Sequence, residues 1–523
     1  MERTDQPANF IPCGCCMSKA SCSMNRRQFI IGAGAGLAAV NLAMSSLAQV
    51  SAGSDVPQFQ PTAPKPLIVQ PVLAIQLFQK RPQTSWRSWG GFHTQEDITK
   101  EQTRISEELK KLQADSEFAI QVRPLVTLSD ANKAAELGKA DHDLTLIYAA
   151  NTDLSILEAL THPAKWTLVF VRHKSGPVYL WYEIAHNRYL RKTVDQFGQP
   201  AMDTRDVVVD LYDELQWRMR ALFGLKNTLG KRIVAIGGAG GWGEGGQKAP
   251  EISKTTWKMD IQTVDYPALG EMIKQARQKE ALVKHCSALA DRMMKESGVK
   301  VEVDPQAIRN AFVLAEVFKG IMDKAQTDSI TVNNCMGTIM PLAETTACLT
   351  LSILNDSGYS AFCESDFVVI PSGLLLHNIS SLPVFLNDPT YPHDGMVTLA
   401  HCTAPRKMGG KVCEPTRIVT HFESDYGAAP KVEMKLGTKM TVIDPDFDNK
   451  VWLGFEGEVI DNPFLDICRS QIDVGIKADC DVLNAQTRGF HWMASYGNYL
   501  RETGYALKKV GVGWNNLSKP GSA

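Results

Sequence analysis

The sequence has no large excess of charge of either sign and no long basic stretch. Its 523 residues carry 55 Lys and Arg against 57 Asp and Glu, so the formal net charge is −2 at pH 7. A protein that holds nucleic acid or an anionic membrane surface by electrostatic attraction needs a basic patch. The sequence therefore gives no support to either class of partner.

The N-terminal apolar run is short and rich in Gly and Ala, which argues against a membrane anchor, the alternative interpretation. The motif NRRQFI at 25–30 precedes this run at 31–48, and small residues suited to cleavage follow, with Ala48 and Ala52 as candidate sites. This arrangement is typical of a twin-arginine export signal. We expect a signal peptide at 1–52, a linker at 53–64, and a folded periplasmic protein without stable membrane insertion.

The cysteines after this leader lack the Cys-x-x-Cys spacing of a zinc site. They stand mostly in apolar or strand-like contexts, which is typical of buried thiols. Four residues could be taken for the ligands of a zinc site: His401, Cys402, Cys413 and His421. Because no Cys-x-x-Cys pair occurs among the cysteines after this leader, we do not expect structural zinc. The eight are Cys286, Cys335, Cys348, Cys363, Cys402, Cys413, Cys468 and Cys480.

Residues 65–230 read as an N-terminal α/β domain. Apolar runs predict strands and periodic polar segments predict exposed helices. The predicted strands are 67–78, 118–128, 144–150, 166–173 and 178–184, and the predicted helices are 93–113 and 204–223.

A second α/β domain is expected at 231–403. Its first strand, 231–237, is followed by Gly238, Gly240 and Gly243, which formally satisfy the G-x-G-x-x-G pattern of dinucleotide-binding proteins. That motif requires a helix beginning inside the glycines, and the residues that follow favour none. We therefore expect a flexible loop near a substrate, with no NAD cofactor.

Two consecutive strand-to-helix units in this domain place a carboxylate at equivalent points. A strand at 328–334 leads to a helix at 342–354 that begins near Glu344, and a strand at 359–363 leads to a helix at 367–379 that follows Asp366. Ser365 is a candidate cap for the second helix and Pro371 would bend it. Ligands of parallel sheets sit where strands end and helices begin, so both carboxylates are candidate site residues, with helix capping as the alternative role.

After Thr403 short alternating runs separated by turn residues indicate an antiparallel barrel or sandwich. The predicted strands are 417–424, 431–436, 439–448, 450–461 and 468–476, and 491–511 is expected to return to helix. The predicted fold is thus α/β, with two parallel-sheet domains followed by a C-terminal antiparallel barrel-like domain at 404–523.

Residues 231–514 resemble the L-fucose isomerase and L-arabinose isomerase superfamily. The resemblance is carried by AETTACLTLSILNDSGYSAFCESDFVVIPSGLL (343–375), PVFLNDP (383–389), LAHCT (399–403) and RGFHWMASYGNY (488–499). It implies a divalent metal, Mn²⁺ or another such as Mg²⁺, held by Glu344, Asp366 and His491. It also implies a homo-oligomer, trimer or hexamer, in which the N-terminal domain of a neighbouring subunit closes the pocket.

Interconverting an aldose and a ketose moves a proton between adjacent carbons through a cis-enediol. A divalent cation that grips both oxygens stabilises the negative charge that develops. Glu344 and Asp366 are the candidates to ligate the metal and to move protons. His491 would complete the metal ligands, with a core histidine as the alternative.

The expected function is a metal-dependent aldose–ketose isomerase acting on a monosaccharide. His401, Trp492 and Arg417 are the candidate substrate contacts, because aromatic faces and forked donors suit polyols. One alternative is a lyase or epimerase that uses the same metal site. Another is an exported sugar-binding protein without catalysis, which would not need a buried metal with two carboxylates.

Overall fold

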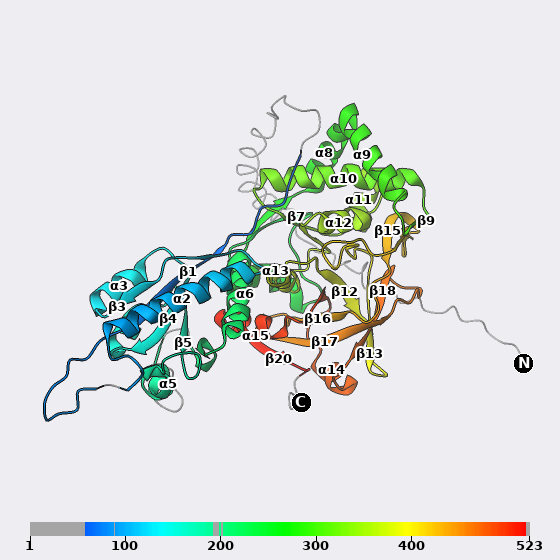
Figure 1. The fold of residues 1–523 in the computed structure, drawn as a ribbon. Helices are drawn as coiled ribbons and strands as arrows, with labels where there is room; N and C mark the ends of the chain where they lie inside the picture. Colours follow the sequence, from blue (N-terminus) through cyan, green and yellow to red (C-terminus); the bar gives the residue numbers. More distant parts are fainter. Residues whose placement is uncertain (1–57, 88, 192–197, 200–201, 519–523) are drawn as a thin grey trace, which may run out of the picture.

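The computed structural model describes residues 58–87, 89–191, 198–199 and 202–518. The twin-arginine motif and the expected cleavage sites lie outside these residues. Figure 1 shows the N-terminal α/β region on one side of the molecule, with the second α/β region above the C-terminal barrel on the other. Helix α6 runs between these two parts of the molecule.

The N-terminal region is a parallel sheet in the order β2-β1-β4-β5-β6, with β3 also paired to β1. Strands β1 and β4 are buried along nearly their whole length, as expected for a sheet covered on both faces. The strands are β1 (Leu67–Ile75), β2 (Ile120–Val122), β3 (Val126–Leu128), β4 (Leu144–Asn151), β5 (Trp166–Val171) and β6 (Val207–Val209). The helices are α2 (Gln95–Asp115), α3 (Ala131–Lys139), α4 (Leu154–Leu160), α5 (Leu180–Ile184) and α6 (Tyr212–Thr228).

Two element predictions in this region are wrong. The run at 178–184 is not a strand, because Leu180–Ile184 forms α5 and Trp181 buries its ring while donating its indole N–H to the Thr152 carbonyl. Periodicity cannot separate a strand from a helix over so few apolar residues. The helix predicted at 204–223 begins only at Tyr212, after a 3₁₀ turn and strand β6.

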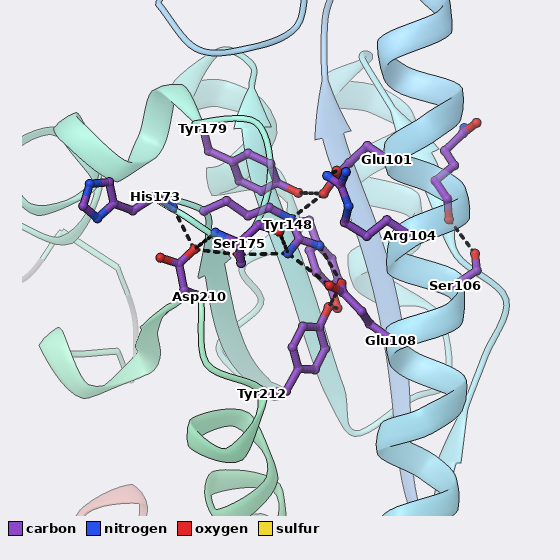
Figure 2. Close-up of polar contacts among 12 residues, drawn as sticks. Glu101, Arg104, Ser106, Glu108, Tyr148, His173, Ser175, Tyr179, Asp210 and Tyr212 are labelled. Atoms are coloured by element: carbon purple, nitrogen blue, oxygen red, sulfur yellow. Dashed lines mark hydrogen bonds and ion pairs between the residues drawn. The ribbon is translucent and has the colours of Figure 1, made fainter.

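A buried polar network joins α2 to the carboxyl end of this sheet (Figure 2). Arg172, which follows β5 and is fully buried, contacts Glu101 at 2.5 Å and Glu108 at 2.6 Å. The Tyr179 hydroxyl donates to Glu101 and the Tyr212 hydroxyl to Glu108, each at 2.6 Å. Glu101 and Glu108 are seven residues apart and so share one face of α2, which fixes that helix against the strand ends.

The second α/β region is a parallel sheet in the order β11-β10-β7-β8. Its strands are β7 (Arg232–Ile236), β8 (Asp260–Val264), β10 (Ser329–Val332) and β11 (Ser360–Cys363). Its helices are α7 (Ala249–Thr256), α8 (Tyr266–Gln278), α9 (Glu280–Met294), α10 (Pro305–Lys324), α11 (Cys335–Ala343), α12 (Ala347–Asp356) and α13 (Ile370–Ser380).

The helix predicted at 342–354 is instead two helices that meet at Glu344. Glu344 ends α11 in the left-handed conformation, with φ of 52°, and α12 starts at Ala347. Pro371 stands in the first turn of α13, where proline is tolerated, so it does not bend that helix. Within the described residues no single helix is long and apolar enough to cross a membrane, although α11 and α12, bent by 87°, pass that test as a pair.

The C-terminal region is a closed antiparallel barrel in the order β16-β19-β12-β13-β18-β17, with β17 pairing back to β16. The predicted fold class is therefore confirmed. The barrel strands are β12 (Phe385–Pro389), β13 (Met396–His401), β16 (Lys439–Asp444), β17 (Val451–Asp461), β18 (Ser470–Ile476) and β19 (Trp492–Tyr496).

The barrel begins earlier in the chain than the expected boundary at 403, because β12 and β13 belong to it. Outside the barrel, β14 (Thr416–His421) pairs with β15 (Tyr426–Val432) and with β9 (Val299–Val301) of the α/β region. The expected helix at 491–511 is instead β19, followed by α15 (Leu500–Lys509). The remaining elements are α14 (Cys480–Gln486) and β20 (Gly513–Asn516), which pairs with β17.

Candidate metal centre

Three adjacent barrel strands bring two histidines and an aspartate to one end of the barrel. In the register of β12 against β19, Asn387 lies opposite Trp492, so the next residue, Asp388, faces His491. In the register of β12 against β13, Asp388 lies opposite Ala400, which immediately precedes His401. Antiparallel pairing thus brings Asp388 beside His491, and His401 comes from the end of the neighbouring strand; the ligand atoms of the three lie within 4.8 Å of one another.

Glu364 reaches the same point from the parallel sheet, directly after β11. Glu364 and Ser365 both adopt positive φ, 64° and 47°, so the chain turns sharply where the strand ends. Left-handed backbone costs a non-glycine residue roughly 1 kcal/mol or more, and such strain tends to occur at functional sites. The turn directs the Glu364 carboxylate towards the two histidines.

The four side chains make short contacts without the geometry of ordinary hydrogen bonds. His491 Nε2 lies 3.2 Å from Glu364 Oε2 and 3.2 Å from Asp388 Oδ1, and His401 Nε2 lies 3.6 Å from Glu364 Oε1. Both histidines are at most 2% exposed, yet neither Nε2 atom has a hydrogen-bond partner within the described part of the chain. Buried nitrogens that face carboxylates in this way suit a shared cation.

Ligand-bearing atoms are close enough in this cluster to hold a metal ion. The ligand atoms of Asp388, His401 and His491 all lie within 4.8 Å of one another, as do those of Cys363, Glu364 and His401. The two groups share His401, and the contact of His491 with Glu364 joins them further. We call Glu364, Asp388, His401 and His491 the candidate metal centre.

A second layer of residues orients both imidazoles. His491 Nδ1 donates to Asp366 Oδ2 at 2.7 Å, and His401 Nδ1 is hydrogen-bonded to the Thr403 hydroxyl at 2.9 Å. Each bond fixes the ring so that Nε2 faces the candidate metal centre. Outer partners of this kind commonly set the tautomer of a metal-binding histidine.

The glycine-rich loop after β7 closes over the same residues. Gly240 pairs with the chain around Asp366, donating to the Ser365 carbonyl and accepting from Phe367 N–H. The loop thereby presents Trp242, whose indole N–H donates to Glu364 Oε2 at 2.8 Å and whose ring stacks on Phe490 at 4.1 Å. The loop is thus a structural support of the centre. A 3₁₀ turn at Gly245–Lys248 and helix α7 follow it directly, so the expectation that these residues favour no helix is wrong.

Replacing Trp242 by Phe tests this support. The Trp242→Phe variant keeps an aromatic ring against Phe490 and loses the hydrogen bond to Glu364, so we expect metal affinity to fall by about 10-fold. Calorimetric titration with Mn²⁺ measures the change, and Trp217→Phe in α6, which removes an indole hydrogen bond to Glu214 instead, is the matched control. An unchanged affinity in Trp242→Phe would show that the indole does not position the carboxylate.

The surroundings drive the pKa values of the two carboxyl groups apart. Burial alone would raise the pKa of Glu364, but the charges of His491 and His401 hold it well below its usual range. Burial raises the pKa of Asp388, only partly opposed by His491. Burial would lower the pKa of both imidazoles, yet the neighbouring carboxylates raise it, most strongly for His491. Carboxyl groups with such divergent pKa values are suited to different roles in acid–base chemistry.

Glu344 is not part of this centre, which corrects the sequence-based ligand set. Its side chain is 62% exposed and forms a 2.8 Å ion pair with Arg277 of α8. The carboxylate that the sequence analysis assigned to Glu344 comes instead from Glu364. Asp366 and His491 do lie together, although Asp366 contacts the outer nitrogen of His491.

Trp492 and Arg417, expected as substrate contacts, lie away from the centre. Trp492 is fully buried in the barrel core against Phe455, because it alternates with His491 along the strand. Arg417 forms a paired contact with Glu302 at 2.9 Å and lies over Phe464. His401, the third expected contact, is one of the four central side chains.

Arg417 is therefore expected to act on stability alone. Hydrogen bonds from Arg417 and Lys300 lower the pKa of Glu302 to about 2, so this stabilisation is present above about pH 4.5 and is lost as the pH falls towards 2. Arg417→Gln should lower the free energy of unfolding by less than about 1 kcal/mol at pH 7, with a smaller difference near pH 3. Urea unfolding at both pH values measures this, and a loss of Mn²⁺ binding would contradict the assignment.

Comparison with known proteins gave no match to any family model and no match among curated proteins. The candidate metal centre is thus described from its own geometry. The sequence carried signals that the prediction passed over. Glu364 directly follows a predicted strand, and Asp388 comes two residues after the apolar run 383–386.

Proposed function

We propose that this protein is a metal-dependent aldose–ketose isomerase acting on a monosaccharide. The observation that carries the proposal is the convergence of two buried histidines and two largely buried carboxylates, all able to bind a metal, where the end of the barrel meets the carboxyl end of the parallel sheet. Ligand sites of parallel α/β sheets lie at that end. The resemblance of residues 231–514 to sugar isomerases supports the same reaction class.

The donor set fits a divalent cation of intermediate hardness. Glu364 and Asp388 supply carboxylate oxygens, and His401 and His491 supply imidazole nitrogens. Oxygen ligands alone would suit Mg²⁺, and the two imidazoles shift the preference towards Mn²⁺. When bound, such a cation polarises the neighbouring carbonyl and hydroxyl oxygens of the sugar and stabilises the charge that develops on them.

The carboxyl groups of this chain can move the proton that isomerisation requires. Glu364, whose pKa is held low, stays ionised and suits a metal ligand, whereas Asp388, whose pKa burial raises, is the better candidate to take up and return the proton. Asp366 keeps the His491 ring in place during this exchange by accepting a hydrogen bond from its Nδ1–H group. The largely buried position of the cluster strengthens its electrostatic interactions.

The proposal extends to the substrate, the location and the oligomeric state of the protein. The substrate is a small sugar, the protein acts in the periplasm after export by the twin-arginine route, and it forms a homo-oligomer. Export of an already folded protein suits a manganese site, because copper and zinc bind nitrogen and oxygen ligands more strongly than manganese.

Deuterium exchange tests the function and separates it from its alternatives. The Mn²⁺-loaded full chain is incubated in D₂O with a panel of aldoses and ketoses, and products are followed by NMR. An isomerase converts one aldose–ketose pair with deuterium entering at C1 or C2, and a chelator stops the reaction. An epimerase would yield a second aldose, and a lyase would yield shorter fragments. A binding protein would be stabilised by a sugar without exchange, which would refute the proposal.

A further inference from the structure

Cys363 brings a sulfur atom to the edge of the candidate metal centre. Its Sγ, a carboxylate oxygen of Glu364 and a ring nitrogen of His401 all lie within 4.8 Å of one another. Cys363 is 5% exposed and forms no disulfide. Among the cysteines that the structure describes, only Cys363 belongs to a group of side chains able to hold a metal ion. The sulfur is therefore a further donor beside a centre built from oxygen and nitrogen.

The backbone at the end of β11 explains how two consecutive residues face one ion. Cys363 is the last residue of β11, opposite Val332 of β10, at the carboxyl end of the parallel sheet. Consecutive side chains of an extended strand point to opposite faces. Glu364 leaves the extended conformation with φ of 64°, so this alternation ends there. The left-handed turn thus accounts for a thiol and a neighbouring carboxylate within reach of the same cation.

The spacing within this group matches a tetrahedral metal site. Ligand atoms bound at zinc-like distances of about 2.0 to 2.3 Å lie about 3.5 Å from one another around a tetrahedron. His401 Nε2 lies 3.6 Å from Glu364 Oε1. His401 is 2% exposed, and this Nε2 atom has no hydrogen-bond partner within the described part of the chain. A buried nitrogen held at ligand spacing from a carboxylate points to a cation between them.

We propose that Cys363, Glu364 and His401 form a position for a thiophilic divalent cation such as Zn²⁺, which overlaps the position proposed for Mn²⁺. Thiolate sulfur favours zinc, whereas manganese prefers oxygen ligands. Three protein ligands leave the fourth tetrahedral position for water or a substrate oxygen, as in zinc sites that stay open. Because Glu364 and His401 belong to both positions, one ion excludes the other.

Binding at this position exchanges a cation for a proton. The S–H bond of Cys363 breaks, a Zn–S bond forms, and the proton leaves to solvent, so no atom changes its oxidation state. The proposal rests on the metal centre of the proposed function but not on sugar isomerisation. Zinc gains more than manganese from the sulfur, so it competes with manganese more strongly than oxygen and nitrogen ligands alone would allow.

Cobalt is the spectroscopic probe for this sulfur, because Co²⁺ occupies zinc sites and a cobalt–thiolate bond gives an intense near-ultraviolet charge-transfer band. The full chain is freed of metal with a chelator and titrated anaerobically with Co²⁺. The wild type should develop the band up to about one equivalent, and added Zn²⁺ should abolish it. Cys363→Ser should lack the band and should lower the ratio of Zn²⁺ to Mn²⁺ affinity at least about 10-fold.

Cys335→Ser is the matched control, because Cys335 is a buried thiol outside the group and its removal should leave the band unchanged. A wild type that binds Co²⁺ without the band would overturn the proposal and leave the manganese centre in place. A band that survives in Cys363→Ser would overturn it in the same way. A wild type that binds neither Co²⁺ nor Mn²⁺ would instead refute the metal centre itself, and the proposed function with it.

Crystals of the Zn²⁺-loaded wild type need no variant, so they decide the question even where Cys363→Ser does not fold. The anomalous map at the zinc edge should place a peak about 2.3 Å from Cys363 Sγ, with Glu364 and His401 as the other protein ligands. A zinc peak bound by Asp388, His401 and His491 without contact to the sulfur would contradict the proposal.

Discussion

Replacing Glu364 by Gln should abolish both metal binding and turnover. The substitution keeps the shape of the side chain and the oxygen that accepts from Trp242, but removes the negative charge that faces His401 and His491. Changes to outer partners already cost about 10-fold to 100-fold in metal affinity, so loss of a direct carboxylate ligand should cost more than about 100-fold. Calorimetric titration with Mn²⁺ measures the affinity, and deuterium exchange into the sugar measures turnover.

Glu344→Gln is the matched control for this experiment. It makes the same chemical change at an exposed carboxylate that pairs with Arg277. We expect it to bind metal and to turn over as the wild type does. If Glu344→Gln lost the metal while Glu364→Gln kept it, the ligand set inferred from the sequence would be right and the assignment from the structure would be wrong.

Asp366→Asn should lower metal affinity by about 10-fold to 100-fold although Asp366 is not assigned as a ligand. Asp366 Oδ1 accepts from the backbone N–H of Val368 and Trp242, so an asparagine must place its own oxygen there. Its NH₂ group then faces His491 Nδ1, which must become an acceptor. The proton of the neutral ring moves to Nε2, and the lone pair needed for a metal is lost.

The control for Asp366→Asn is another aspartate that accepts backbone N–H groups. Asp356 accepts from Arg406 and Lys407, and Asp356→Asn should leave metal affinity unchanged. Titration of both variants with Mn²⁺ decides the matter. Equal affinities in Asp366→Asn and the wild type would show that the tautomer of His491 is not set by Asp366.

Much of the fold was predictable because its strands are long apolar runs and its helices are periodic. The α/β class, the order of the regions and the antiparallel barrel follow from that pattern. The failures occurred where local pattern is ambiguous. The run at 178–184 is too short for its pattern to distinguish a strand from a helix. The helix predicted at 342–354 is interrupted at Glu344, whose left-handed conformation cannot be predicted from the local sequence.

The candidate site was only partly predictable for a physical reason. Asp388 and His491 come together because β12 pairs with β19, about a hundred positions away, which is not visible in local sequence, and His401 joins them from the neighbouring strand β13. The choice of Glu344 over Glu364 followed from expecting a helix to start at Glu344. Glu364 stands instead in a strained turn directly after a strand, and only the backbone conformation reveals where its carboxylate points.

The most direct test of the metal assignment is an anomalous diffraction map at the manganese absorption edge, recorded from crystals of the Mn²⁺-loaded protein. The structure predicts one strong peak bounded by the carboxylates of Glu364 and Asp388 and the Nε2 atoms of His401 and His491, about 2 Å from its ligands. A peak beside Glu344, or no ordered manganese within this cluster in crystals that contain the ion, would contradict the assignment.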